Sequence, residues 1–143
     1  MFAIEYDVKK VYMGRLEHGD DLLESLQKFV EDKGIKMGII QVIGAAQRAT
    51  LGFYDGNRKV YEKIEIEDEL EIAGGWGNIS LKDGKPMVHL HVVVSNREGR
   101  AFGGHVFEGT KVFACEFIIK HLEGPVLERA LDDVTGLTLW KQT

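Results

Sequence analysis

The chain has 143 residues, 44% of them hydrophobic, which is enough for one domain with its own core and too few for two. Its formal net charge of −5 argues against a protein that holds DNA or RNA on a broad basic surface, because such binding requires Lys and Arg to neutralise phosphates. The sequence has neither an uncharged apolar run long enough to span a membrane nor the apolar stretch of a secretory signal at its start, so we expect residues 1–143 to form a single cytoplasmic domain.

The first two expected elements differ in the spacing of their apolar residues. Residues 2–16 mix β-branched, aromatic and charged residues in rough alternation, which predicts an opening strand. After Asp20, a candidate N-cap, apolar residues recur at helical spacing until Lys33 and Gly34, a last-turn cation and a C-cap glycine. The second element is therefore expected to be a helix with an apolar stripe of Leu22, Leu23, Leu26, Phe29 and Val30.

The middle of the chain predicts a series of strands separated by turn residues. One strand is expected at Ile39–Ile43, followed by a break at the small residues 44–46 and a second strand that ends at the turn pair 55–56. Short strands should continue through residues 59–88, with a hairpin-like turn at residues 83–84.

The elements expected in the last third of the chain decide the fold class. A strand is expected at residues 111–119, a short helix within residues 125–133 and a final strand at residues 137–141. With one or two helices among many strands, the class is α/β in the α+β sense, with a mixed, largely antiparallel sheet flanked by one or two helices.

Several glycines fall inside segments that otherwise have the pattern of strands. They are Gly74, Gly75, Gly77, Gly103 and Gly104. Glycine in a strand usually marks a bulge or a close approach of another backbone. These positions are therefore candidates for a functional surface.

Other residues with reactive or charged side chains favour ordinary structural roles. Cys115 lies in the apolar run "VFACEFII", where a buried thiol acts as a small hydrophobe. Alternating glutamates at positions 65, 67, 69 and 71 are typical of the solvated side of an exposed strand, although one of them could serve as a general base. His18 and His121 are expected to face solvent.

The stretch "PMVHLHVVVSNREGRAFGGHV" places three of the five histidines around one expected hairpin. Side chains alternate between the faces of a strand, so His89 and His91 leave the core together, with their Cα atoms roughly 7 Å apart. The opposite face carries a continuous apolar stripe of Val88, Leu90, Val92 and Val94.

The position of His105 depends on the length of the hairpin loop. A three-residue loop at 97–99, with Gly99 in the left-handed position, would pair Asn96 with Arg100 and place His105 directly opposite His91. A loop of two or four residues without a bulge would turn His105 to the other face.

Three neutral imidazoles with an open fourth position form the ligand set of a catalytic or exchangeable zinc site. The alternative is that a His-x-His pair on an exposed strand is ordinary polar surface. The sequence lacks a Ser-His-Asp spacing, a phosphate-binding loop, a Cys-x-x-Cys pair and a dinucleotide fingerprint. His89, His91 and His105 are therefore the principal candidates for chemistry.

The series "HLHV…EGRAFGGHVFEG", preceded by "GAAQRATLGFYD" and "LEIAGGWGNISL", resembles the plant-and-prokaryote-conserved (PPC, also PCC) domain, particularly its stand-alone bacterial and archaeal members. The resemblance runs from Arg15 to the closing strand. It implies a mixed sheet flanked by helices, assembled as a homotrimer, with a metal, usually zinc, at the histidine series. Arg15 and Glu71 also fall at motif positions, and Gly103 and Gly104 adjoin the third histidine.

The resemblance also carries a DNA-binding label, because plant members join this domain to an AT-hook that enters the minor groove. The sequence contains no such Arg-Gly-Arg-Pro element, so any DNA binding should be weak. Three hypotheses follow. The first is a zinc-binding homotrimer whose substrate and reaction are open, with a small molecule as one possible ligand and a zinc-assisted hydrolase or lyase as the class if it is an enzyme. The second is a DNA-associated regulatory or protein-interaction module, and the third is a ligand sensor that reports metal occupancy.

Overall fold

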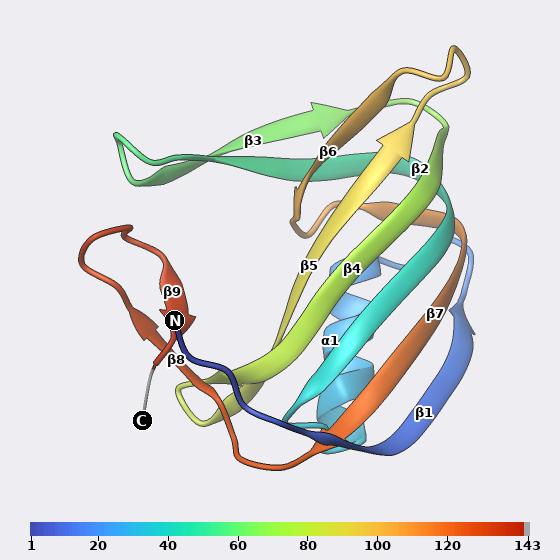
Figure 1. The fold of residues 1–143 in the computed structure, drawn as a ribbon. Coiled ribbons are helices and arrows are strands. Elements are labelled where there is room, and N and C mark those ends of the chain that lie inside the picture. The colour runs from blue at the N-terminus through green and yellow to red at the C-terminus, as the bar shows by residue number, and fades with distance from the viewer. Residues whose placement is uncertain (142–143) are drawn as a thin grey trace.

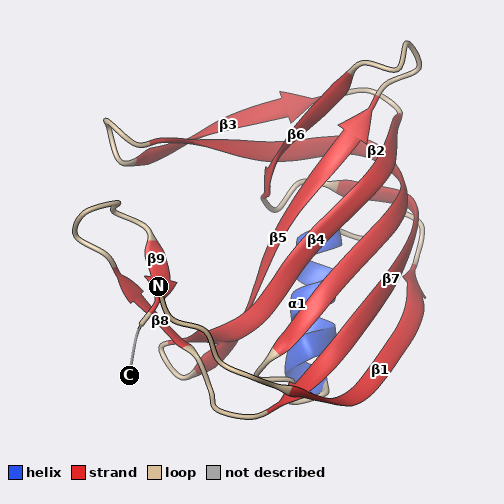
Figure 2. Cartoon of the chain, viewed as in Figure 1, coloured by secondary structure: helices blue, strands red, loops and turns tan. Residues whose placement is uncertain are grey.

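The computed structural model describes residues 1–141, in which one helix packs against a nine-stranded sheet (Figure 1). All strand pairs but one are antiparallel, so the expected mixed, largely antiparallel sheet is confirmed (Figure 2). The elements are β1 (Asp7–Leu16), α1 (Leu22–Asp32), β2 (Gly38–Asp55), β3 (Val60–Ile66), β4 (Leu70–Lys82), β5 (Lys85–Ser95), β6 (Ala101–Val106), β7 (Lys111–Glu123), β8 (Glu128–Leu131) and β9 (Thr138–Trp140).

The long strand β2 closes part of the sheet on itself. Its first half pairs with β4 and β7, whereas Leu51 and Gly52 in its second half pair with β6. Because β4, β5 and β6 also pair in turn, these strands form a closed circuit with β2. The end of β2 then continues with β3 as an arm that projects beyond the rest of the sheet (Figure 1).

A bulge replaces the break expected at residues 44–46. β2 runs through these residues, and its register with β4 shifts between Val42 and Gly44. Gly44 has φ +149°, and a Cβ built there would lie 2.1 Å from the carbonyl oxygen of Ala114. The small residues therefore permit a close approach of β7 and a bend in β2 instead of ending the strand.

The helix begins one residue later than expected. Asp21, and not Asp20, is the N-cap, because its Oδ1 atom accepts hydrogen bonds from the backbone N–H groups of Leu23 and Glu24. The side chain of Gln27 bonds to backbone groups of β5, which fixes the helix on that strand. The buried stripe that packs on the sheet comprises Leu22, Leu26 and Val30.

The two faces of the sheet have different environments. The face toward α1 holds the core, which includes the β5 stripe of Val88, Leu90, Val92 and Val94. The opposite face, which we call the open face, carries a cross-strand row that runs through Met13, Ile118, Gln41, Trp76, His91, His105, Gly52 and Lys63. The strand phase expected for β5 is therefore confirmed.

The C-terminal segment corrects the expected second helix. Within residues 125–133 the chain forms β8, which pairs in parallel with residues Leu81 and Lys82 of β4 and antiparallel with β9. Pairing to an existing sheet edge outweighs the helical spacing of so short a segment. β1 begins at Asp7 and not at residue 2, and β7 continues to Glu123. Within residues 1–141, no helix is long and apolar enough to cross a membrane.

Candidate metal centre

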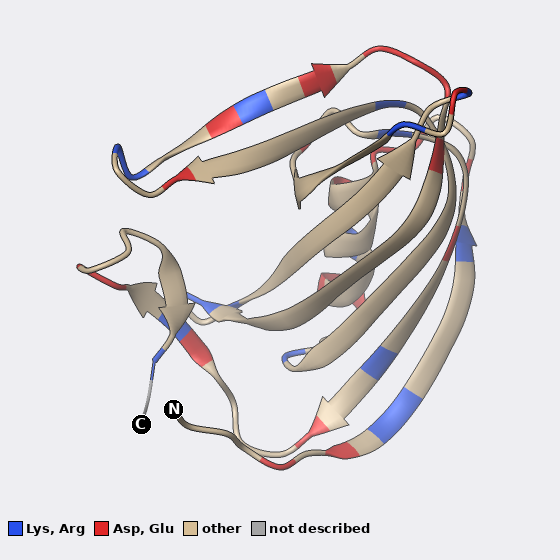
Figure 3. Cartoon of the chain, turned by 45° about the horizontal axis from the view of Figure 1, so that its top comes forward, with Lys and Arg blue, Asp and Glu red and all other residues tan. Residues whose placement is uncertain are grey.

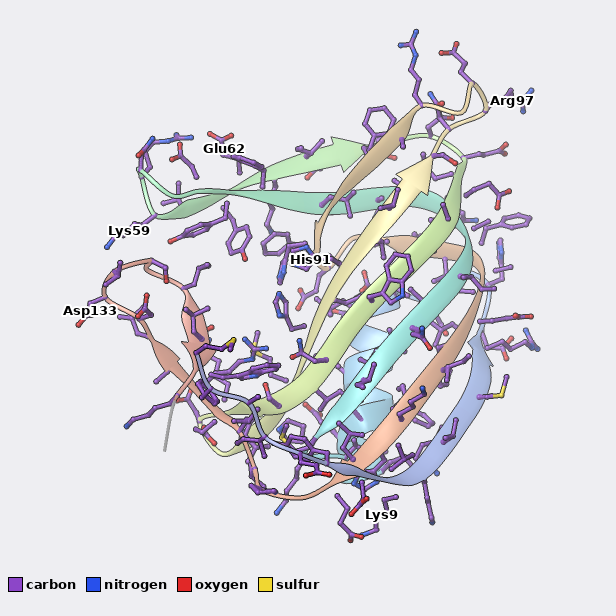
Figure 4. The ribbon with its side chains drawn as sticks, viewed as in Figure 1. Lys9, Lys59, Glu62, His91, Arg97 and Asp133 are labelled. Atoms are coloured by element: carbon purple, nitrogen blue, oxygen red, sulfur yellow. The ribbon has the colours of Figure 1, made fainter. Side chains whose placement is uncertain are left out.

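Three imidazole rings converge on the open face of the sheet. His89 and His91 project from β5, and His105 lies opposite His91 on β6. The Nε2 atoms of His89 and His91 are 3.1 Å apart, and one ligand nitrogen from each of the three residues lies within 4.8 Å of the others. The three rings therefore form one cluster, in the place that the three-residue loop predicts. Figure 4 shows His91 between the β2–β3 arm and the β8–β9 hairpin.

The hairpin loop sets this register. The Oδ1 atom of Asn96 accepts hydrogen bonds from the backbone N–H groups of Glu98 and Arg100, at 3.1 and 3.0 Å. Gly99 has φ +76°, a left-handed conformation that suits glycine. The backbone N–H of Asn96 also bonds to the carbonyl oxygen of Arg100, which closes the three-residue loop. The alternative loops of two or four residues are thereby excluded.

Aromatic rings hold His105 from the side of the β2–β3 arm. Its ring centroid lies 5.0 Å from those of both Tyr61 and Phe107. Gly52 is the cross-strand partner of His105, and a Cβ at that position would lie 2.3 Å from the Phe107 ring. Glycine at position 52 therefore leaves the space in which Phe107 packs against the histidine.

One nitrogen of this cluster lacks a partner. The Nδ1 atom of His105 is buried and has no hydrogen bond among the described residues. A buried polar atom without a partner destabilises the folded protein unless something else satisfies it. A cation held by the cluster would supply such a partner, so the residues fit a metal ion.

The environment keeps the imidazoles in their neutral form. Burial, the Arg129 guanidinium and the neighbouring rings lower the pKa of His89 from 6.5 to about 4. Burial, His91 and Arg129 lower the pKa of His105 to about 4, and burial lowers that of His91. Neutral imidazole is the form that binds metal, so the cluster is ready to coordinate at pH 7.

Arg129 is the functional candidate that the sequence did not reveal. Its Nη2 atom lies 3.4 Å from Nδ1 of His89 and donates to Oδ1 of Asn78 at 2.7 Å. Its Nε atom donates to Oγ of Ser80, and Nη1 donates to the carbonyl oxygen of Thr138. The side chain reaches the cluster because β8 pairs with the end of β4, a contact between distant parts of the chain that no local pattern signals.

A pocket adjoins the cluster between the β2–β3 arm and the β8–β9 hairpin. Its volume is about 330 Å³. Two hydrogen bonds join the arm to the hairpin: from the hydroxyl of Tyr54 to the carbonyl oxygen of Thr135, and from Nζ of Lys59 to that of Asp133. The lining consists of Tyr54, Lys59, Val60, Tyr61, Lys82, Met87, His89, His105, Arg129, Gly136, Leu137, Thr138 and Leu139.

The other candidate residues lie in different parts of the sheet. Arg15 is exposed on β1 and pairs with Glu17, and Glu71 is exposed where β4 pairs with the end of β5. Neither belongs to the imidazole cluster. Gly103 pairs with Val93, whereas a Cβ on Gly104 would lie 2.7 Å from the carbonyl oxygen of Gly52 in β2. Gly104 therefore marks the expected close approach of two backbones.

Most residues for which the sequence predicts an ordinary structural role have that role in the structure. Cys115 is buried, and burial raises the pKa of its thiol to about 11, so it is not poised as a nucleophile. The four alternating glutamates are exposed, as expected. His18 is exposed, whereas His121 is half-buried and not fully solvent-facing.

Comparison with known proteins places this fold and site in a family. The family model of the Plants and Prokaryotes Conserved (PCC) domain matches residues 3–123. The chain belongs to this PCC domain family. The matched region contains the whole imidazole cluster and ends before β8, so Arg129 lies outside it.

Solved structures of similar proteins cover essentially the full chain. A metal-containing protein from Archaeoglobus fulgidus is 42% identical with a TM-score of 0.94, covering 99% of this chain and 100% of its own. A plant- and prokaryote-conserved protein from Pyrococcus horikoshii is 34% identical with a TM-score of 0.93, covering 100% of this chain and 99% of its own. A candidate DNA-binding protein from Bacteroides thetaiotaomicron is 27% identical with a TM-score of 0.86, covering 95% of this chain and 96% of its own.

The chain also matches a small part of longer curated proteins. The bifunctional protein GlmU of Synechococcus sp. (strain JA-3-3Ab) is 31% identical over 111 residues, which is 77% of this chain. This chain spans about a fifth of the length of the curated relatives that it matches, at 17% and 19%.

Proposed function

We propose that residues 1–143 form a single cytoplasmic PCC domain that assembles as a homotrimer and binds zinc through His89, His91 and His105. The convergence of three neutral imidazoles, with ligand nitrogens within 4.8 Å of one another, carries this proposal. The description of the Archaeoglobus fulgidus relative as metal-containing supports a metal at this position.

The donor set favours zinc among the common metals. Imidazole nitrogen suits Zn²⁺ and other borderline transition metals, whereas Mg²⁺ and Ca²⁺ require oxygen ligands. Three protein ligands leave a coordination position free, which is typical of catalytic and not of structural zinc. Bound there, zinc supplies Lewis-acid chemistry, the basis of zinc-assisted hydrolases and lyases.

Residues around the cluster shield it from water on one side and place a positive charge beside it. Tyr61 and Phe107 exclude water from one side of His105. Arg129 fixes a positive charge beside His89, on the wall of the pocket. These features suit a small molecule that enters the pocket and meets His89 and His105 on its wall.

The open face supports the homotrimer. Large apolar side chains are exposed on it, including Met13 with 78% of its surface exposed and Trp76 with 60%. The central strands β2, β4 and β5 carry few charged side chains along their middle portions, as Figure 3 shows. An apolar surface of this kind favours contact with other copies of the chain.

A second candidate function is a DNA-associated regulatory or protein-interaction module. The description of the Bacteroides thetaiotaomicron relative as a candidate DNA-binding protein favours it. The acidic net charge and the lack of an AT-hook in the sequence weigh against direct binding to DNA. We therefore rank it below the metal-binding function.

A zinc titration with matched histidine variants tests the proposal. Calorimetry of the metal-free protein should give one zinc per chain, with tight binding lost in His91→Ala and His105→Ala and retained in His121→Ala. Light scattering should give the mass of three chains. Equal affinity in His91→Ala and wild type would refute the metal site, and a monomeric mass would refute the trimer.

A further inference from the structure

The pocket beside the imidazole cluster is cationic, although the protein is acidic. Three of its lining residues carry a positive charge: Lys59, Lys82 and Arg129. No Asp or Glu is among the residues that line it. In a chain with 23 acidic and 18 basic residues, this local excess of cations indicates a site for a negatively charged group.

Arg129 makes this excess significant because it is buried. Only 8% of its surface is exposed. Its hydrogen-bond partners are the neutral groups of Ser80, Asn78, Thr138 and His89, and none of the ion pairs among residues 1–141 involves it. A buried charge is normally paired, because burial without a counter-charge is costly.

The four partners leave one of the five guanidinium N–H groups of Arg129 available. Lys82 lies directly beside Arg129, as its partner in the parallel pairing of β4 and β8. The remaining walls are largely apolar and aromatic, formed by Met87, Tyr61, Leu137 and Leu139. A ligand that fits both parts has an anionic end and a small apolar body.

We propose that this pocket binds a small organic carboxylate, with its carboxylate group held by Arg129 and Lys82 and its apolar body against Tyr61 and Leu139. The pocket shares His89 and His105 with the imidazole cluster, so the carboxylate lies next to the proposed zinc. The assignment of small carboxylates as the substrate class of the proposed zinc site therefore rests on the proposed function. Binding of the anion itself requires no metal.

Benzoate and benzamide form a matched pair of probes, because they share an apolar ring and differ in charge. In an NMR titration of the metal-free protein at pH 7.5, we expect benzoate to bind at least about tenfold more tightly than benzamide. Arg129→Gln should abolish this preference, whereas Lys120→Gln on β7 should retain it, although both remove one positive charge. Equal binding of the two probes, or an unchanged preference in Arg129→Gln, would overturn the proposal.

A second variant and a second anion complete the test. Arg129 bonds to several strands, so Lys82→Gln, an exposed position, is measured in parallel and should weaken benzoate binding with the fold intact. Inorganic phosphate binding as tightly as benzoate would refute the apolar part of the site. The zinc titration of the same samples separates the two proposals: benzoate preference without zinc binding refutes the metal site alone, and zinc binding without benzoate preference refutes the carboxylate site alone.

Discussion

The lowered pKa values of the clustered histidines predict that the metal-free protein loses stability in mild acid. Above pH 6.5, His89 and His105 are neutral in both the folded and the unfolded state. As the pH falls toward 4, the unfolded chain takes up protons that the folded protein does not, so the free energy of unfolding decreases. The loss is complete once the pH is below the folded pKa of about 4.

The size of this effect follows from the two pKa values. A fall from 6.5 to about 4 corresponds to about 3.4 kcal/mol per histidine, at about 1.36 kcal/mol per pKa unit. Both rings are partly exposed, so solvent screening reduces this to roughly half. The pair should then account for about 3 kcal/mol, a large fraction of the typical stability of a domain, about 5–15 kcal/mol.

Urea denaturation of the metal-free protein between pH 7.5 and 4.5 measures the greater part of this loss, because the remainder appears only near and below the folded pKa of about 4. The matched control is the double variant His89→Gln and His105→Gln, which should show a much weaker dependence on pH. Asp55 and Asp132 interfere little, because hydrogen bonds from Arg58 and Thr135, respectively, lower the pKa of each carboxyl from 3.8, and the stability that this adds is lost mainly below the pH range of the titration. Identical pH profiles for wild type and the double variant would refute the reasoning.

Three further predictions concern the core, DNA and a close backbone contact. Leu90→Ala should lower the free energy of unfolding by about 2–5 kcal/mol, because Leu90 is fully buried, and should leave zinc affinity unchanged in calorimetry. A silent Leu90→Ala would contradict the strand phase. Binding to duplex DNA should be in the non-specific range, about 10⁻⁴ M or weaker at physiological salt, and submicromolar, A·T-selective binding in a salt titration would reverse our ranking of functions. Gly104→Ala should cost about 1–3 kcal/mol in thermal or urea unfolding, because its Cβ would lie 2.7 Å from the Gly52 carbonyl oxygen, whereas Gly56→Ala, which has open space, should be neutral; equal stabilities would contradict the contact.

Local sequence signals were sufficient to predict the imidazole cluster. The alternation of β5 and the turn residues Asn96 and Gly99 act over a few residues, so they fix the face and the register directly. The helical spacing predicts α1 equally well, and the N-cap lies one residue after the expected Asp20 because two aspartates stand side by side.

The features that the sequence does not predict are those that depend on contacts between distant parts of the chain. The bulge at Gly44 is required by the approach of β7, which lies some 70 residues later in the sequence. β8 is only 4 residues long and becomes a strand because the edge of β4 is available for pairing. Arg129 could not be assigned to the site for the same reason, since its role exists only after that pairing forms.

The imidazole cluster and Arg129 lie in different segments of the chain. The proposed metal binding and the proposed selection of a ligand, which many binding sites combine, are therefore assigned to separate segments. The three imidazoles lie within residues 89–105, on one hairpin and inside the region that the family model matches. Arg129 is supplied by a short segment after residue 123, outside that region. If Arg129 holds the ligand as proposed, substitutions in this C-terminal segment would change which molecule is selected without touching the strands that carry the histidines. On the proposed function, ligand preference and metal binding would then vary independently, because the terminal hairpin and the histidine strands are separate segments of the chain.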